Sequence, residues 1–155
     1  MNIKAYLVDS WNLNNQVTLY LLDHINSAWL PAKLNGSERS IGEQFLHINN
    51  IRSFWIGKVG EKIDLKLDKK YAQDKSKLED ALRKSSQKMD GTLSHIFKQE
   101  NIKGHKPHAV AFFSQMIAHE SHHRGQIMTT VTRNGLPIDK SVNFGLWNWN
   151  NKYNR

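Results

Sequence analysis

The sequence contains no cysteine among its 155 residues. This absence excludes disulfide frameworks, thiolate metal sites and cysteine nucleophiles, so any bound metal must use nitrogen or oxygen ligands. The absence of cysteine is also typical of a protein from a reducing compartment, and we expect a cytoplasmic location.

Long apolar runs are missing as well. No stretch of the sequence approaches the ~18 uninterrupted apolar residues of a membrane span, so we expect no membrane segment. The first residues, Met1-Asn2-Ile3-Lys4, lack the apolar core and the small-residue cleavage site of a signal peptide. The length predicts a single domain over residues 1–155, which is long enough to bury a core.

The charge balance is basic, with 22 Lys and Arg against 14 Asp and Glu. Such a balance is compatible with a nucleic-acid partner. However, acidic residues interrupt the lysines between residues 58 and 88 throughout. The pattern therefore favours a solvated, mildly basic surface over a nucleic-acid interface.

Four long stretches repeat apolar residues at steps of three and four, which predicts amphipathic helices. Ser40 followed by Glu43 forms a capping box at the start of the second, and Pro107 suits the first turn of the fourth. The pair Asn134-Gly135 ends the fourth. The four predicted helices span residues 9–28, 40–59, 74–100 and 107–134.

The rest of the chain shows no clear strand. Residues 61–71 are predicted to be a connection. The tail from Leu136 to Arg155 has no helical period and carries Trp147 and Trp149, which we expect to pack against the bundle or a partner. The sequence thus predicts an all-α protein, a four-helix bundle with a C-terminal aromatic-rich tail.

The motif H-E-S-H-H-R-G-Q, from His119 to Gln126, lies in the fourth predicted helix. His119 and His123 are four residues apart, so they project from one helix face, and two imidazoles at that spacing can hold one metal ion. They also continue the apolar stripe, which places them toward the interior. That stripe comprises Phe112, Met116, His119, His123, Ile127 and Thr130.

His47 lies on the margin of the apolar stripe of the second predicted helix. Ligands in helical bundles converge from facing helices, so His47 can complete a three-histidine site if the second and fourth helices are neighbours. Three protein ligands leave at least one coordination position for water or substrate. Imidazole ligands suit zinc, nickel, copper or iron.

The other histidines are weaker candidates. His24 continues the stripe of the first helix and is predicted to be a hydrogen-bonded core residue. His122 lies on a different side of its helix from the pair. His95, His105 and His108 are predicted to lie on the surface.

The letters H-E-x-x-H also match the zinc metalloprotease motif, in which Glu120 would be the base. No histidine follows His123, and no clear edge strand is available to align a peptide. Glu120 precedes Arg124 by four residues, the favourable order for a surface ion pair on a helix. We therefore disfavour a protease and assign no residue as a catalytic acid or base.

His47 in the second helix, followed by H-x-x-x-H-R-G-Q in the last, resembles the DinB-like or YfiT-like superfamily of metal-binding four-helix bundles. The resemblance covers most of the chain and is strongest over residues 40–55 and 119–135, with a Gly-Leu-Trp-x-Trp tail similar to that of some members. It implies that His47, His119 and His123 bind a divalent metal, zinc or nickel. It also implies that Gly125 permits close helix packing and that Arg124 is structural.

Characterised relatives in that superfamily include transferases that use low-molecular-weight thiols such as bacillithiol, and a mycothiol-dependent isomerase. The resemblance therefore implies a metal-dependent enzyme, a thiol S-transferase or a hydrolase, that acts on a small molecule such as a low-molecular-weight thiol and forms a homodimer. The alternative is a non-enzymatic bundle with a structural metal or a basic nucleic-acid-binding surface.

Overall fold

The computed structural model describes residues 2–34, 36, 39–59, 61, 63–99 and 108–153. This part of the chain is helical and contains no strand, which confirms the all-α fold class. None of its helices combines the length and the apolarity that crossing a bilayer requires. The long helices are α1 (Ile3–His24), α2 (Ile41–Lys58), α3 (Lys75–Gln99) and α4 (Ala109–Arg133). The short ones are η1 (Ser27–Trp29), η2 (Lys69–Tyr71), α5 (Lys140–Gly145) and α6 (Asn150–Tyr153).

The helix boundaries follow their capping residues. The predicted capping box is confirmed, because the Ser40 hydroxyl accepts from the Glu43 amide at 3.3 Å and the Glu43 carboxylate accepts from the Ser40 amide at 2.8 Å. By contrast, α1 begins well before the predicted Asp9, with Asn2 as its N-cap. The predicted start of the fourth helix, Pro107, lies outside the described residues, and α4 has His108 as its N-cap.

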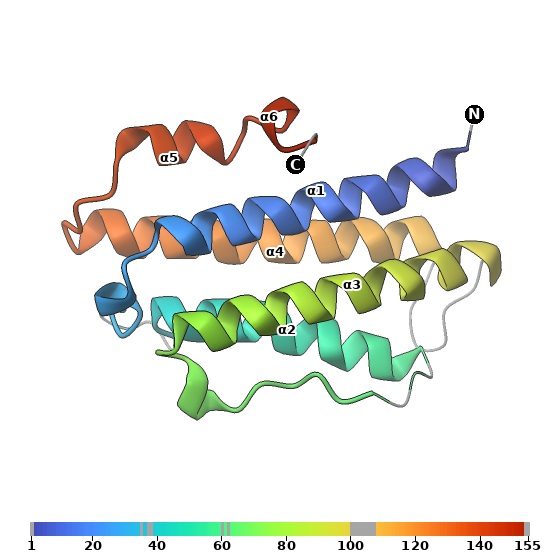
Figure 1. The fold of residues 1–155 in the computed structure, drawn as a ribbon, viewed down its shortest axis with the longest axis horizontal. Coiled ribbons are helices and arrows are strands. Elements are labelled where there is room, and N and C mark those ends of the chain that lie inside the picture. The colour runs from blue at the N-terminus through green and yellow to red at the C-terminus, as the bar shows by residue number, and fades with distance from the viewer. Residues whose placement is uncertain are drawn as a thin grey trace.

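The four long helices form a bundle in which α1 and α4 run one way and α2 and α3 the other (Figure 1). Both α1 and α2 pack against α3 and α4, so α1 and α2 occupy opposite corners. Since α2 and α3 are parallel, the chain between them returns along the length of the bundle (Figure 1). The arrangement makes α2 and α4 antiparallel neighbours, as a shared histidine site requires.

Side chains of α2 hold this returning connection in place. The Asn50 amide group exchanges two hydrogen bonds with the Leu67 backbone, at 2.8 and 3.0 Å. Asn49 donates to the Leu65 carbonyl at 2.9 Å, and the Leu65 amide donates to Ser53 at 3.0 Å. The described residues of this segment thus form a connection, as predicted, which ends in η2 against the start of α2.

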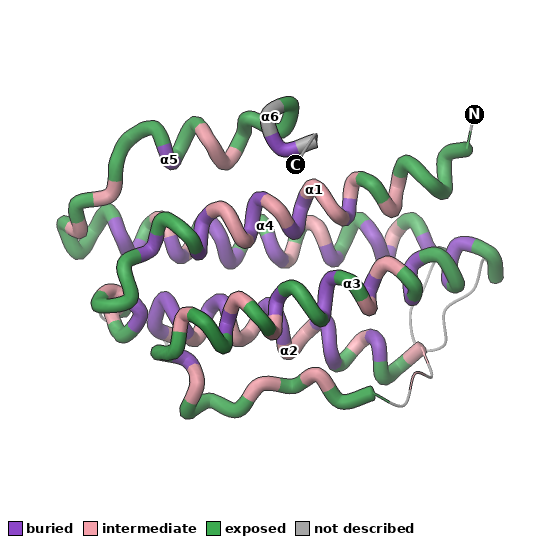
Figure 2. Tube along the Cα trace, viewed as in Figure 1, coloured by how far each residue is buried: buried purple, intermediate pink, exposed green. Residues whose placement is uncertain are grey.

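The core has two apolar ends and a polar middle. Figure 2 shows the buried positions on the sides of the long helices that face one another. Buried polar side chains separate the two apolar clusters along all four helices. One cluster includes Leu21, Ile41, Phe45, Ile48, Leu82 and Ile127, and the other includes Trp11, Ile56, Met89, Leu93, Phe112 and Met116. Between them lie Asn14, Thr18, Arg52, Ser85, Glu120 and Arg124.

The C-terminal tail differs from the expectation of a segment without helices. It contains the short helices α5 and α6, which lie against α1, although its sequence has no helical period. Lys152 explains part of this, because its ammonium group donates to the Gly145 carbonyl and lies 4.3 Å from the centre of the Tyr20 ring. Trp147 is 80% exposed and does not pack against the bundle, while Trp149 is 36% exposed; packing of the two tryptophans against a partner stays a prediction.

Candidate metal centre

The structure brings together the three histidines that the sequence singled out. His47 of α2 and His119 of α4 place their Nε2 atoms 3.3 Å apart, and the Nε2 of His123 lies 3.0 Å from that of His119. Each of the three offers one ring nitrogen, and these nitrogens all lie within 4.8 Å of one another. We call these residues the histidine cluster.

The spacing of these nitrogens fits a divalent metal ion. Zn–N bonds of about 2.0–2.1 Å in a tetrahedral site place two ligand nitrogens about 3.3 Å apart. The Nε2 separations in the histidine cluster, 3.0 and 3.3 Å, are close to that value. His123 is buried and the other two residues are half-buried, so the cluster is partly accessible to solvent. Three histidines so arranged could bind a metal ion.

Two glutamine side chains orient His123. Its Nδ1 lies 2.6 Å from Oε1 of Gln44 and 3.0 Å from Oε1 of Gln126. Because both partners are acceptors, the proton of the neutral ring belongs on Nδ1, which leaves the Nε2 lone pair directed at the cluster. His119 differs, since its buried Nδ1 has no hydrogen-bond partner within the described part of the chain.

This contact predicts that Gln44 controls metal affinity through His123. A Gln44→Leu variant removes the acceptor at 2.6 Å and should weaken zinc binding about 10–100-fold. Gln44→Glu keeps an acceptor at the same place and should retain the affinity. Competition with a chromophoric chelator measures both constants, and equal affinities of the Leu variant and the wild type would contradict the proposed role.

The environment keeps the three rings neutral. Burial lowers the pKa of His47 to about 4, with the charge of Arg39 and the neighbouring His119 acting in the same direction. Burial likewise lowers the pKa of His123 to about 4, helped by the other two rings. The pKa of His119 is also lowered by burial, although the Glu120 carboxylate opposes the change. Neutral rings present the lone pairs that metal binding requires.

The remaining histidines lie away from the cluster or on its margin. His24 is exposed, and its Nδ1 lies 2.8 Å from the Tyr20 carbonyl, so the predicted core position is wrong. His95 and His108 are exposed, as predicted, and His105 lies outside the described residues. His122 is exposed, with its ring 5.3 Å from that of His123.

Glu120 is fully buried, which corrects the expectation of a surface ion pair with Arg124. Its carboxylate accepts two hydrogen bonds from the guanidinium of Arg52, at 2.6 and 2.8 Å, and one from Asn14 at 2.7 Å. Arg124 lies farther away, at 3.8 Å. Burial raises the pKa of Glu120, but the charge and hydrogen bonds of Arg52 outweigh it, so the pKa lies below its usual value.

Further polar groups complete this buried set, which we call the Arg52–Glu120 network. Arg52 also donates to Asn15 and to the Leu82 carbonyl, both at 2.9 Å, so the network joins all four long helices. Arg124 donates to Asn14 and Thr18, at 2.9 and 2.8 Å, so it is part of the network, as a structural role would require. Both carboxylate oxygens of Glu120 accept hydrogen bonds within this network. Glu120 therefore does not correspond to the catalytic base of a metalloprotease.

Sequence reasoning missed the roles of Arg52, which pairs with Glu120, and of Gln44, which contacts His123. Arg52 lies four residues from both Ile48 and Ile56 on the buried side of α2, and a cation at that register was a usable signal. The expected role of Gly125 in close packing is wrong, because the residue is exposed and a Cβ atom there would meet nothing within 4 Å.

Two clefts were considered as substrate sites. One, of about 270 Å³, opens beside the histidine cluster, and we call it the His47 cleft. Its lining residues are Arg39, Glu43, Leu46, His47, Asn50 and Lys69.

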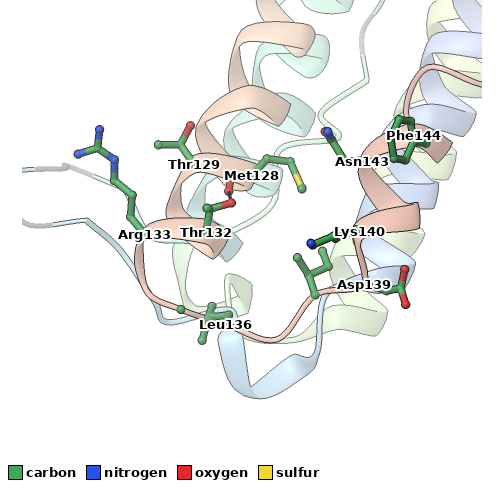
Figure 3. Close-up of a pocket in the computed structure, with 11 residues that line it drawn as sticks. Met128, Thr129, Thr132, Arg133, Leu136, Asp139, Lys140, Asn143 and Phe144 are labelled. Atoms are coloured by element: carbon green, nitrogen blue, oxygen red, sulfur yellow. Dashed lines mark hydrogen bonds between the residues drawn. The ribbon is translucent and has the colours of Figure 1, made fainter.

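The other, of about 770 Å³, lies between the end of α4 and α5 and contains no histidine in its wall. Figure 3 shows Met128 and Thr132 on one side of it and Asn143 and Phe144 on the other. Its acidic residue, Asp139, is used as the N-cap of α5, where it accepts from the Ser141 amide at 2.7 Å. The histidines therefore direct attention to the His47 cleft.

The fold and the histidine cluster define the class as an all-α helical bundle with a possible three-histidine metal site. The chain belongs to the DinB family, whose match covers residues 1–138 and so includes the four long helices. No curated protein and no solved structure matches the chain.

Proposed function

We propose that this protein is a metal-dependent enzyme that uses a zinc or nickel ion, held by His47, His119 and His123, to activate a low-molecular-weight thiol for transfer to a small electrophilic substrate. The observation that carries the proposal is the convergence of three neutral imidazole nitrogens at tetrahedral spacing beside an open cleft. A divalent ion there would supply Lewis acidity, which lowers the pKa of a coordinated thiol or water. Activation of a coordinated water for hydrolysis is the second candidate function.

The residues around the histidine cluster would orient its rings and shield a bound ion. Gln44 and Gln126 fix the tautomer of His123, and Glu120 of the Arg52–Glu120 network follows His119 directly in α4. Three protein ligands leave open positions, a layout typical of catalytic sites, whereas structural sites are closed by four. The set of three protein ligands therefore favours an enzyme over a structural metal site.

A nucleic-acid-binding function has less support. Several of the cations between residues 58 and 88 pair with acidic side chains, as Lys88 does with Glu61 and Arg83 with Glu79. Such pairs reduce the positive potential that attracts phosphates. Homodimerisation and the cytoplasmic location remain predictions.

Metal analysis of protein purified without a histidine tag tests the proposal. The wild type should contain about one equivalent of metal, and His119→Ala should lose it because the central nitrogen of the cluster disappears. His122→Ala is the matched control, since His122 is an exposed neighbour in the same helix. Unchanged metal content in His119→Ala would show that the site is wrong.

Thiol transfer is then measured with the metal-loaded wild type, a panel of small thiols and an electrophilic chromophore. Turnover that depends on both metal and thiol supports the transferase. Turnover of esters or amides without any thiol would instead support the hydrolase.

A further inference from the structure

Two cations from different parts of the chain meet in the wall of the His47 cleft. Arg39 comes from the connection that leads into α2 and is half-buried. Lys69 comes from η2, where the long connection between α2 and α3 returns to the start of α2. The topology thus places both cations beside a histidine of the cluster.

The carboxylate in the same wall does not cancel this charge. One oxygen of Glu43 accepts from the Ser40 amide at 2.8 Å in the capping box, and the other lies 2.7 Å from the ammonium group of Lys69. Among the described residues that line the cleft, two side chains are cationic and one is anionic.

We propose that Arg39 and Lys69 form an oxyanion subsite, which selects substrates that carry a carboxylate or phosphate group beside the group that reaches the histidine cluster. This inference rests on the proposed function and names the chemistry of its substrate. A guanidinium group binds carboxylate and phosphate oxygens through paired hydrogen bonds, so Arg39 provides the geometry. The Lys69 side chain is 80% exposed and has room to turn toward an entering anion.

A pair of thiols that differ only in charge tests this subsite. We would titrate cobalt-loaded protein with 3-mercaptopropionate and with 3-mercaptopropanamide, and follow the visible spectrum of the cobalt ion. The carboxylate should bind about tenfold more tightly than the amide, as one charge-assisted hydrogen bond provides. Inorganic phosphate should compete with 3-mercaptopropionate and leave the binding of the amide unchanged.

Variants assign the preference to residues. Arg39→Gln should abolish the preference for the carboxylate and leave the affinity for the amide unchanged, and Lys69→Gln should reduce the preference. Lys70→Gln is the matched control, because the adjacent exposed Lys70 lies over the Tyr71 ring and does not line the cleft. This variant should behave as the wild type.

The outcomes separate the subsite from the proposed function. If the protein binds cobalt and both thiols bind equally, the subsite is wrong and the metal site stands. If Arg39→Gln weakens both thiols by the same factor, the residue acts through the metal centre and the subsite is again wrong. If cobalt does not bind at the cluster, the proposed function itself fails.

Discussion

A Glu120→Gln variant should have a free energy of unfolding about 3–5 kcal/mol lower than that of the wild type. The side chains of Glu120 and Arg52 are both 0% exposed, and their paired hydrogen bonds are 2.6 and 2.8 Å long. Glutamine has nearly the same shape but no charge, so the guanidinium group of Arg52 would remain buried without a counterion. Leaving a buried charge unpaired costs more than the pair contributes when it is intact.

Urea unfolding followed by circular dichroism measures this difference. Glu79→Gln is the matched control, because it breaks an exposed ion pair with Arg83 on α3 and should cost at most about 0.5 kcal/mol. An Arg52→Met and Glu120→Gln double variant should lose less stability than the sum of the two single variants, since the residues contact each other directly.

The same variant also distinguishes the two roles considered for Glu120. If the residue is structural, Glu120→Gln keeps the metal content of the wild type while its stability falls. A variant that retains full stability but loses metal-dependent turnover would instead assign Glu120 as a base, and would contradict the structural role.

The helices were predictable where apolar periodicity and capping coincide. The apolar residues that recur with a helical period in the third predicted helix are buried, namely Leu78, Leu82, Met89, Leu93 and Ile96. The Ser40 capping box begins α2 as expected. The start of α1 was not predictable from its stripe, because its first residues are exposed and follow the Asn2 cap. Apolar periodicity reports burial, so it misses helical turns that extend beyond the core.

The histidines of the candidate site were also accessible from the sequence. His119 and His123 share a face through local spacing, and His47 needed only the assumption that α2 and α4 are neighbours. The partner of Glu120 was not accessible in this way. Local spacing pointed to Arg124, but the closer partner is Arg52, which comes from a different helix and is 68 positions away in the sequence. A single sequence does not record which of two cations a buried carboxylate will contact.

The largest effect of a ligand should come from the metal. We expect zinc to stabilise the protein by about 4 kcal/mol when the free ion exceeds its Kd a thousandfold, because the ion binds only the folded chain. For a chain of this length that gain raises the Tm by about 8–16 °C. A chelator should reverse the shift, and differential scanning calorimetry with and without zinc measures it.

The metal-free protein should nevertheless remain folded, which separates an open catalytic site from a structural one. The two apolar clusters contain none of the three histidines, so the core persists without the ion. His47→Ala should abolish the zinc-dependent rise in Tm, whereas His95→Ala, at an exposed position on α3, should retain it. If chelation unfolds the chain as it unfolds a zinc finger, the ion is structural and the proposed enzyme is wrong. If the helical signal survives and only the Tm falls, the bundle itself supplies the fold, and the histidine cluster is left available for chemistry.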